Sequence, residues 1–198
     1  MFPHISEVIM VAIHLLWLPI LLSAVAVFIL SSIIHMFLGY HSSDFHKLPD
    51  EEATANALRT LGIPPGEYLL PHASSMAEMQ SPEFIERTKK GPRALLTIWA
   101  GGSISMTREL ITWFFYTIVV SIFAAYIVGR ALHPGAAYLA VFRFVGVTTF
   151  AGYVLAGWQD SIWYKRAWLT SIKNSFDGLI YAAATAAIFG WLWPLSAM

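Results

Sequence analysis

The chain has 198 residues, of which 57% are hydrophobic and only 12% charged, and its acidic and basic side chains balance to a formal net charge of zero. Soluble domains of this size carry about 25% charged residues, so the composition predicts a membrane protein. The charge balance excludes the basic surplus of a nucleic-acid-binding protein. Cysteine is absent, which excludes disulfides, thiolate metal sites and thiol nucleophiles.

Four long apolar stretches predict an all-α membrane protein with four transmembrane helices. The helices are expected at about 8–40, 108–132, 136–158 and 175–193. Residues 1–41 therefore form an N-terminal transmembrane helix with a bend at Pro19, and residues 108–198 form a three-helix transmembrane bundle. No basic n-region precedes the first stretch, so we expect it to be retained and not cleaved as a signal peptide.

Residues 42–107 are expected to form a small cytoplasmic cap between the first and second helices. One short helix is predicted to begin at the acidic turn 50–52, because the helix dipole favours acids in the first turn. A second is predicted to begin at Ser81, an N-cap residue followed by proline. Beyond it, residues 94–99 and 104–106 predict a loose hairpin.

The basic residues beside these helices predict the orientation of the chain. Lys165, Arg166 and Lys173 follow the third helix, whereas the turn between the second and third helices offers only Arg130. Because short loops rich in Lys and Arg stay in the cytoplasm, both termini are expected in the periplasm and the long loop in the cytoplasm. The expected location is the bacterial inner membrane.

Small residues recur at every fourth position of the last helix. The stripe consists of Gly178, Ala182, Ala186 and Gly190. Such a stripe suits either packing within the three-helix bundle or a dimer seam, because small side chains let helix backbones approach closely in lipid. The first helix lacks an equal stripe and presents Leu18 and Val25, so it is expected to contact lipid or a partner subunit.

Histidines and carboxylates cluster where the first helix leaves the membrane. The candidate metal ligands are His35, His41, His46 and His72, with Asp44 and Glu52 nearby. Imidazole and carboxylate groups suit zinc, iron or copper. No pair has the i, i+4 spacing that sets two ligands on one helical face. The alternative is therefore a polar helix exit whose histidines bond backbone carbonyls and headgroups, and the sequence requires no cofactor.

Two further residues are expected as buried ionisable groups, His14 in the first helix and Arg143 in the third. Ionisable groups within a membrane favour a functional role. His14 together with His133 would offer two imidazoles to a haem, although His133 belongs to a turn. Arg143 either snorkels to the headgroups or pairs with an anion, and the latter would suit a small transporter or channel.

Several short motifs are spread over nearly the whole chain. They are Ser31-Ser32, His35-Met36, Gly39-Tyr40-His41, Pro65-Gly66, Tyr68, Pro71-His72, Gly91-Pro92 and Phe176-Asp177-Gly178-Leu179-Ile180-Tyr181. In these motifs the chain resembles a group of small bacterial four-helix membrane proteins of unknown function. The resemblance implies a four-span architecture and assigns no catalytic residue.

The sequence contains no nucleophile elbow, phosphate loop or dinucleotide fingerprint, so we expect no enzyme. It favours a non-catalytic accessory or structural subunit of a larger bacterial inner-membrane complex, of photosynthetic or respiratory type. The expected partners are other integral membrane subunits and lipids, with no nucleic acid. The alternatives are a metal-dependent membrane enzyme or redox protein that uses the histidine cluster, and a small transporter or channel.

Overall fold

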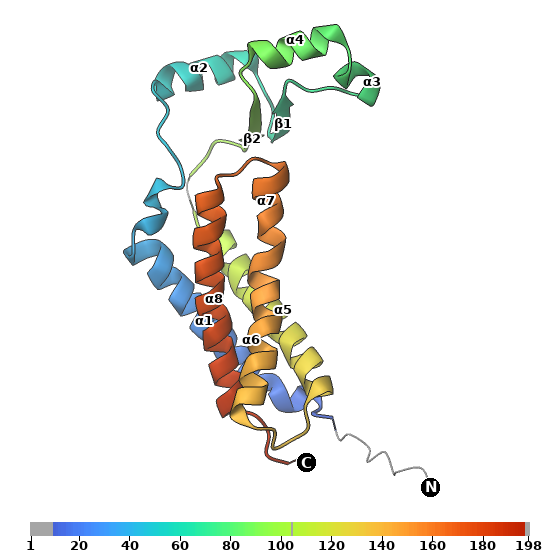
Figure 1. Ribbon diagram of the computed structural model, residues 1–198. Helices are drawn as coiled ribbons and strands as arrows, with labels where there is room; N and C mark the ends of the chain where they lie inside the picture. Colours follow the sequence, from blue (N-terminus) through green and yellow to red (C-terminus); the bar gives the residue numbers. More distant parts are fainter. Residues whose placement is uncertain (1–9, 104, 197–198) are drawn as a thin grey trace. The chain divides into compact units, whose positions relative to one another are not determined.

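The computed structural model describes residues 10–103 and 105–196. The chain divides into two units (Figure 1). Unit 1 comprises Met1–Phe45 and Ser105–Met198, and unit 2 comprises His46–Ile104. Unit 1 is mostly helical, whereas unit 2 combines three short helices with one two-stranded sheet.

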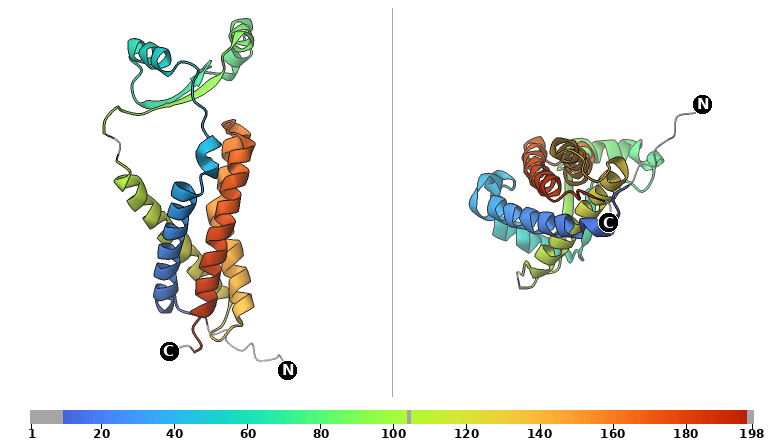
Figure 2. Two further views of the ribbon diagram at one scale, coloured as in Figure 1. Left: turned by 90° about the vertical axis from the view of Figure 1, so that its left-hand side faces the viewer. Right: turned by 90° about the horizontal axis from the view of Figure 1, so that it is seen from below.

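Unit 1 is a helical bundle. Its elements are η1 (Ile13–Leu16), α1 (Trp17–Phe37), η2 (Tyr40–Ser43), α5 (Thr107–Ala131), α6 (Tyr138–Val154), η3 (Leu155–Gly157), α7 (Trp158–Trp163) and α8 (Trp168–Trp191). Figure 2 shows α1, α5, α6 and α8 side by side, with α7 continuing the column of α6. The chain changes from η1 to α1 between Leu16 and Trp17, and the expected bend at Pro19 stays a prediction. Pro19 itself lies in the first turn of α1, where its missing N–H costs no hydrogen bond.

Three helical stretches among the described residues are long and apolar enough to cross a membrane. They are Ile13–Phe37, Thr107–Ala131 and Tyr138–Trp163. The fourth expected span corresponds to α8, which has 24 residues but carries Lys173 and Asp177 in its first half. The prediction that this helix begins at 175 is wrong: it begins at Trp168, directly after a break at Lys165, whose φ is 59°.

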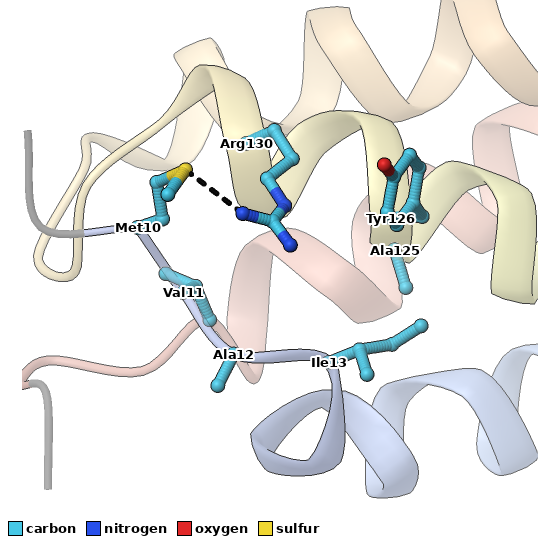
Figure 3. Close-up of a pocket in the computed structure, with 7 residues that line it drawn as sticks. All are labelled: Met10, Val11, Ala12, Ile13, Ala125, Tyr126 and Arg130. Atoms are coloured by element: carbon cyan, nitrogen blue, oxygen red, sulfur yellow. Dashed lines mark hydrogen bonds between the residues drawn. The ribbon is translucent and has the colours of Figure 1, made fainter.

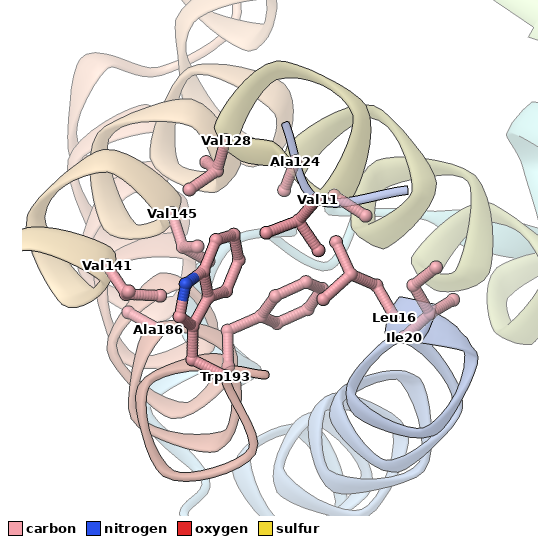
Figure 4. Close-up of a cluster of buried hydrophobic side chains, with 11 residues drawn as sticks. Val11, Leu16, Ile20, Ala124, Val128, Val141, Val145, Ala186 and Trp193 are labelled. Carbon is pink, nitrogen blue, oxygen red and sulfur yellow. The ribbon is translucent and has the colours of Figure 1, made fainter. Parts of the chain in front are cut away.

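The core of unit 1 joins all four long helices (Figure 4). Its members are Val11, Leu16, Ile20, Ala124, Ala125, Val128, Val141, Val145, Ala186, Phe189 and Trp193. The small-residue stripe of α8 packs within this bundle, against α6. A Cβ on Gly178 would lie 2.3 Å from Val154 Cγ2, and one on Gly190 would lie 2.6 Å from the Tyr138 ring. Glycine is therefore required at both contacts, since any larger residue would force the helices apart.

Unit 2 contains three helices and a two-stranded sheet. Its elements are α2 (Glu51–Leu61), β1 (Gly66–Leu70), α3 (Met76–Met79), α4 (Pro82–Lys90) and β2 (Ala94–Ile98). The predicted starts of the two cap helices match, because Asp50 caps α2 and Ser81 caps α4. The predicted hairpin is wrong, since β2 pairs antiparallel with β1, from Gly66↔Ile98 to Leu70↔Ala94. No described residue of unit 2 is fully buried.

Candidate metal centre

Three residues from distant parts of unit 1 bring potential metal ligands together. His35 lies in the last turn of α1, His41 in η2, and Asp177 in the interior of α8. Each offers one ligand atom, and these atoms all lie within 4.8 Å of one another. The ring centroids of His35 and His41 are 4.5 Å apart. A single cation placed between these groups can therefore contact all three.

A glycine turn folds the second histidine back toward α8. Gly39 follows the end of α1 and has φ 66°, a left-handed conformation that L side chains rarely adopt. The chain reverses there and forms η2, which carries Tyr40 and His41 against α8. The sequence Gly-Tyr-His thus supplies the His41 imidazole and, through the turn at Gly39, directs it toward α8.

Asp177 is buried, with 2% of its surface exposed, and it has two partners from η2. The Tyr40 hydroxyl donates to Asp177 Oδ1, and His41 Nε2 lies 2.8 Å from Asp177 Oδ2. A buried carboxylate is costly unless it is paired and hydrogen-bonded, so these contacts explain how α8 tolerates an acid at this depth. Burial and the Asp177 hydrogen bond raise the pKa of Tyr40, which keeps the phenol protonated as a donor.

The other ring nitrogen of His41 contacts a second carboxylate. His41 Nδ1 lies 2.7 Å from Asp44 Oδ2. Carboxylates in this position orient metal-binding histidines and fix their tautomer. With the Nδ1 proton directed at Asp44, Nε2 is the nitrogen that faces Asp177 and the centre of the cluster.

Lys173 of α8 holds η2 against α8 through three hydrogen bonds. Its ammonium donates to Asp44 Oδ1 at 2.8 Å, to the Tyr40 carbonyl at 2.6 Å and to Ser43 Oγ at 2.9 Å. Burial opposes ionisation of Asp44, but the hydrogen bonds from Lys173 and His41 outweigh it and hold the pKa of that carboxyl below its ordinary value. Asp44 is therefore a carboxylate at neutral pH, and η2 and α8 are held together by charge.

The predicted ligands divide between the two units. His35 and His41 meet in unit 1, whereas His46 and His72 belong to unit 2 and are outside the cluster. Sequence reasoning missed Asp177 as a ligand, because the helix predicted at 175–193 would place it in a first turn, where an acid is favoured by the helix dipole. That assignment is wrong because α8 begins at Trp168. The signal that could have found it was an acid in the interior of an apolar helix.

The remaining predicted residues lie elsewhere on unit 1. His14 and Arg143, expected as buried ionisable groups, are exposed on the outside of the bundle, because the inward positions of their helices hold apolar residues. His133 lies in the turn before α6, where its Nδ1 is 2.7 Å from the Pro134 carbonyl oxygen. Leu18 and Val25 are also exposed, on the outer face of α1.

A pocket of about 310 Å³ lies where the segment before η1 meets α5 (Figure 3). Its lining consists of Met10, Val11, Ala12, Ile13, Ala125, Tyr126 and Arg130. The Arg130 guanidinium lies over the Tyr126 ring, 5.5 Å from its centroid, and contacts Met10 Sδ at 3.3 Å. None of these lining residues is a carboxylate or an imidazole, so the pocket offers no set of metal ligands.

No family model, curated protein or solved structure matches the chain. The likeness to small bacterial four-helix membrane proteins stays a prediction from the sequence. The chemistry of the candidate metal centre is therefore the main ground for assigning a function.

Proposed function

We propose that this chain is an integral membrane protein that binds one divalent transition-metal ion through His35, His41 and Asp177. The observation that carries the proposal is the approach of three ligand atoms to within 4.8 Å of one another. Two imidazoles and a carboxylate suit zinc above the alkaline-earth ions. Three protein ligands with a free fourth position are typical of catalytic zinc sites, so the function we propose is metal-dependent.

The contacts around the ligands support this assignment. Asp44 accepts from His41 Nδ1, and the ion would take the place of the proton between His41 Nε2 and Asp177, which gives the arrangement common around zinc-bound histidines. His41 Nε2 and Asp177 Oδ2 are 2.8 Å apart. Two ligands at about 2.0–2.1 Å from a tetrahedral zinc are separated by roughly 3.3 Å. To hold the ion, these two atoms would part by about half an ångström, and His35, whose ligand atom lies within 4.8 Å of the others, would rotate inward.

We further propose that α8 is a fourth span, which gives a bacterial inner-membrane protein with periplasmic termini and a cytoplasmic segment at 42–107. Two backbone hydrogen bonds support an even number of crossings. Val11 N donates to the Gly129 carbonyl at 2.9 Å, and Gly135 N donates to the Pro194 carbonyl at 2.7 Å. Both described ends of the chain thus lie beside the turn between α5 and α6.

Metal analysis of purified protein tests the proposed centre. Protein in mild detergent, stripped with chelator and titrated with zinc, is expected to bind one ion per chain. His35→Ala and Asp177→Asn are expected to lower the affinity about tenfold to a hundredfold or more. His133→Ala, which removes an exposed histidine from a turn, is the matched control and should bind like the wild type. Equal zinc binding by all four proteins would refute the centre.

A second candidate function is a non-catalytic accessory subunit of a larger membrane complex. It is favoured by unit 2, in which no described residue is fully buried, and by the exposed apolar face of α1 with Leu18 and Val25. Native mass spectrometry of the chain extracted from its own membrane tests it. Stoichiometric partners that are detected with the wild type and lost in Val25→Trp would support the accessory role. Detection of the wild-type chain without any partner would refute the accessory role.

A further inference from the structure

The three ligand residues of the candidate metal centre differ in exposure. Asp177 is buried and His41 is half-buried, but His35 is exposed. The free coordination position therefore lies beside His35, since the other two ligands are enclosed by η2 and α8. Whatever completes the coordination of the ion must arrive past the end of α1.

That side of the centre is apolar and lies at the end of a membrane-spanning stretch. His35 belongs to the last turn of the candidate span Ile13–Phe37. Leu38, three positions after His35 and on the same helical face, is 57% exposed, and the adjacent Met36 is 73% exposed. The hydrocarbon core of a bilayer is only about 30 Å thick, so a membrane-spanning helix ends near its edge. In an integral membrane protein, exposed apolar side chains at that edge contact lipid. The opening thus faces the level of the lipid headgroups.

The charges of the centre favour an anion in the free position. Asp44 and Asp177 contribute two negative charges, Lys173 contributes one positive charge, and a divalent ion adds two more. The cluster with metal therefore carries one net positive charge. At the membrane interface, where water is reduced, an uncompensated charge strongly attracts an anionic ligand.

We propose that an anionic phospholipid reaches the centre sideways from the bilayer and supplies a headgroup oxygen to the fourth coordination position of the metal. This inference rests on the proposed metal function and names its ligand. The acyl chains lie against Met36 and Leu38, and the headgroup lies beside His35. The lipid is thus the class of molecule on which any metal-dependent chemistry at this site acts.

Zinc titration in lipid nanodiscs tests the proposal. The chain is reconstituted with phosphatidylcholine alone or with added phosphatidylglycerol, in about 0.5 M salt so that surface charge is screened. Zinc is expected to bind about tenfold more tightly with phosphatidylglycerol, the effect of one charge-assisted ligand. Native mass spectrometry should show one phosphatidylglycerol retained with zinc, and none after His35→Ala.

Two matched controls locate the lipid. Leu38→Gln is expected to lose the lipid dependence while it keeps zinc binding in phosphatidylcholine, because it removes an acyl-chain contact and no ligand. Phe115→Gln changes an equally apolar exposed residue on α5, 62% exposed, and should keep the dependence. Equal loss in both variants would overturn the lateral route.

The outcomes separate this inference from the proposed function. Stoichiometric zinc with the same affinity in both lipids overturns the lipid ligand and leaves the metal centre intact. Inorganic phosphate that strengthens zinc binding in phosphatidylcholine as much as phosphatidylglycerol does overturns the lipid source in favour of a soluble anion. Absence of zinc binding in either nanodisc overturns the metal centre itself.

Discussion

Replacing Lys173 with methionine is expected to destabilise unit 1 strongly. The ammonium makes three hydrogen bonds of 2.6–2.9 Å to η2, and its side chain is only 14% exposed. Methionine keeps the length of the side chain but removes the charge and all three bonds. Asp44, whose side chain is 7% exposed, then keeps only His41 as a partner.

Removal of one partner from a buried ion pair costs about 3–5 kcal/mol, because the remaining charge stays buried without compensation. The lower end of this range applies here, since His41 still contacts Asp44. We expect a loss of about 3 kcal/mol in the free energy of unfolding, and thus a melting temperature lower by roughly 6–12 °C. Thermal unfolding in mild detergent, followed by circular dichroism without added metal, measures it.

Two companion variants decide whether charge is the cause. Lys165→Met removes a lysine whose ammonium, among the described residues, donates to the Ile162 carbonyl alone, and it should leave the melting temperature nearly unchanged. Lys173→Met combined with Asp44→Asn should recover part of the loss, because no uncompensated carboxylate remains. A double variant no more stable than Lys173→Met alone would refute the argument from charge.

Three further predictions follow from single contacts. Gly178→Ala places a Cβ 2.3 Å from Val154 and should cost about 1–3 kcal/mol of unfolding free energy in denaturant titrations; a neutral result would mean that α6 and α8 separate freely. Gly39→Ala should cost about 1–2 kcal/mol through its φ of 66° alone, because its Cβ meets nothing within 4 Å. Tyr40→Phe removes the donor to Asp177 and should weaken zinc binding about tenfold to a hundredfold in the same titration; unchanged affinity would exclude a role for the phenol in orienting Asp177.

Hydropathy located the helices well because the apolar stretches are long and uninterrupted. The bounds Thr107–Ala131 of α5 differ little from the predicted 108–132. The predicted start of α8 is wrong because Lys173 is typical of a loop and Asp177 is typical of a first helical turn. Inside the bundle their charges are balanced by residues of η2, and no local pattern carries that information.

Only the two histidine ligands of the candidate site could be predicted from the sequence. His35 and His41 were identified because they lie close in sequence beside the end of an apolar helix. Asp177 lies 136 positions from His41, and its place depends on how α8 packs against α1. The same limit explains the wrong hairpin, because β2 pairs with β1, from which two helices separate it, and not with the residues that directly follow it.

The candidate metal centre also constrains the order of biogenesis. His35 and His41 leave the ribosome with the first helix, whereas Lys173 and Asp177 arrive with the last. Until α8 is inserted, Asp44 lacks its lysine and the two histidines lack their carboxylate. The proposed metal site can therefore be completed only after α8 has been synthesised and inserted.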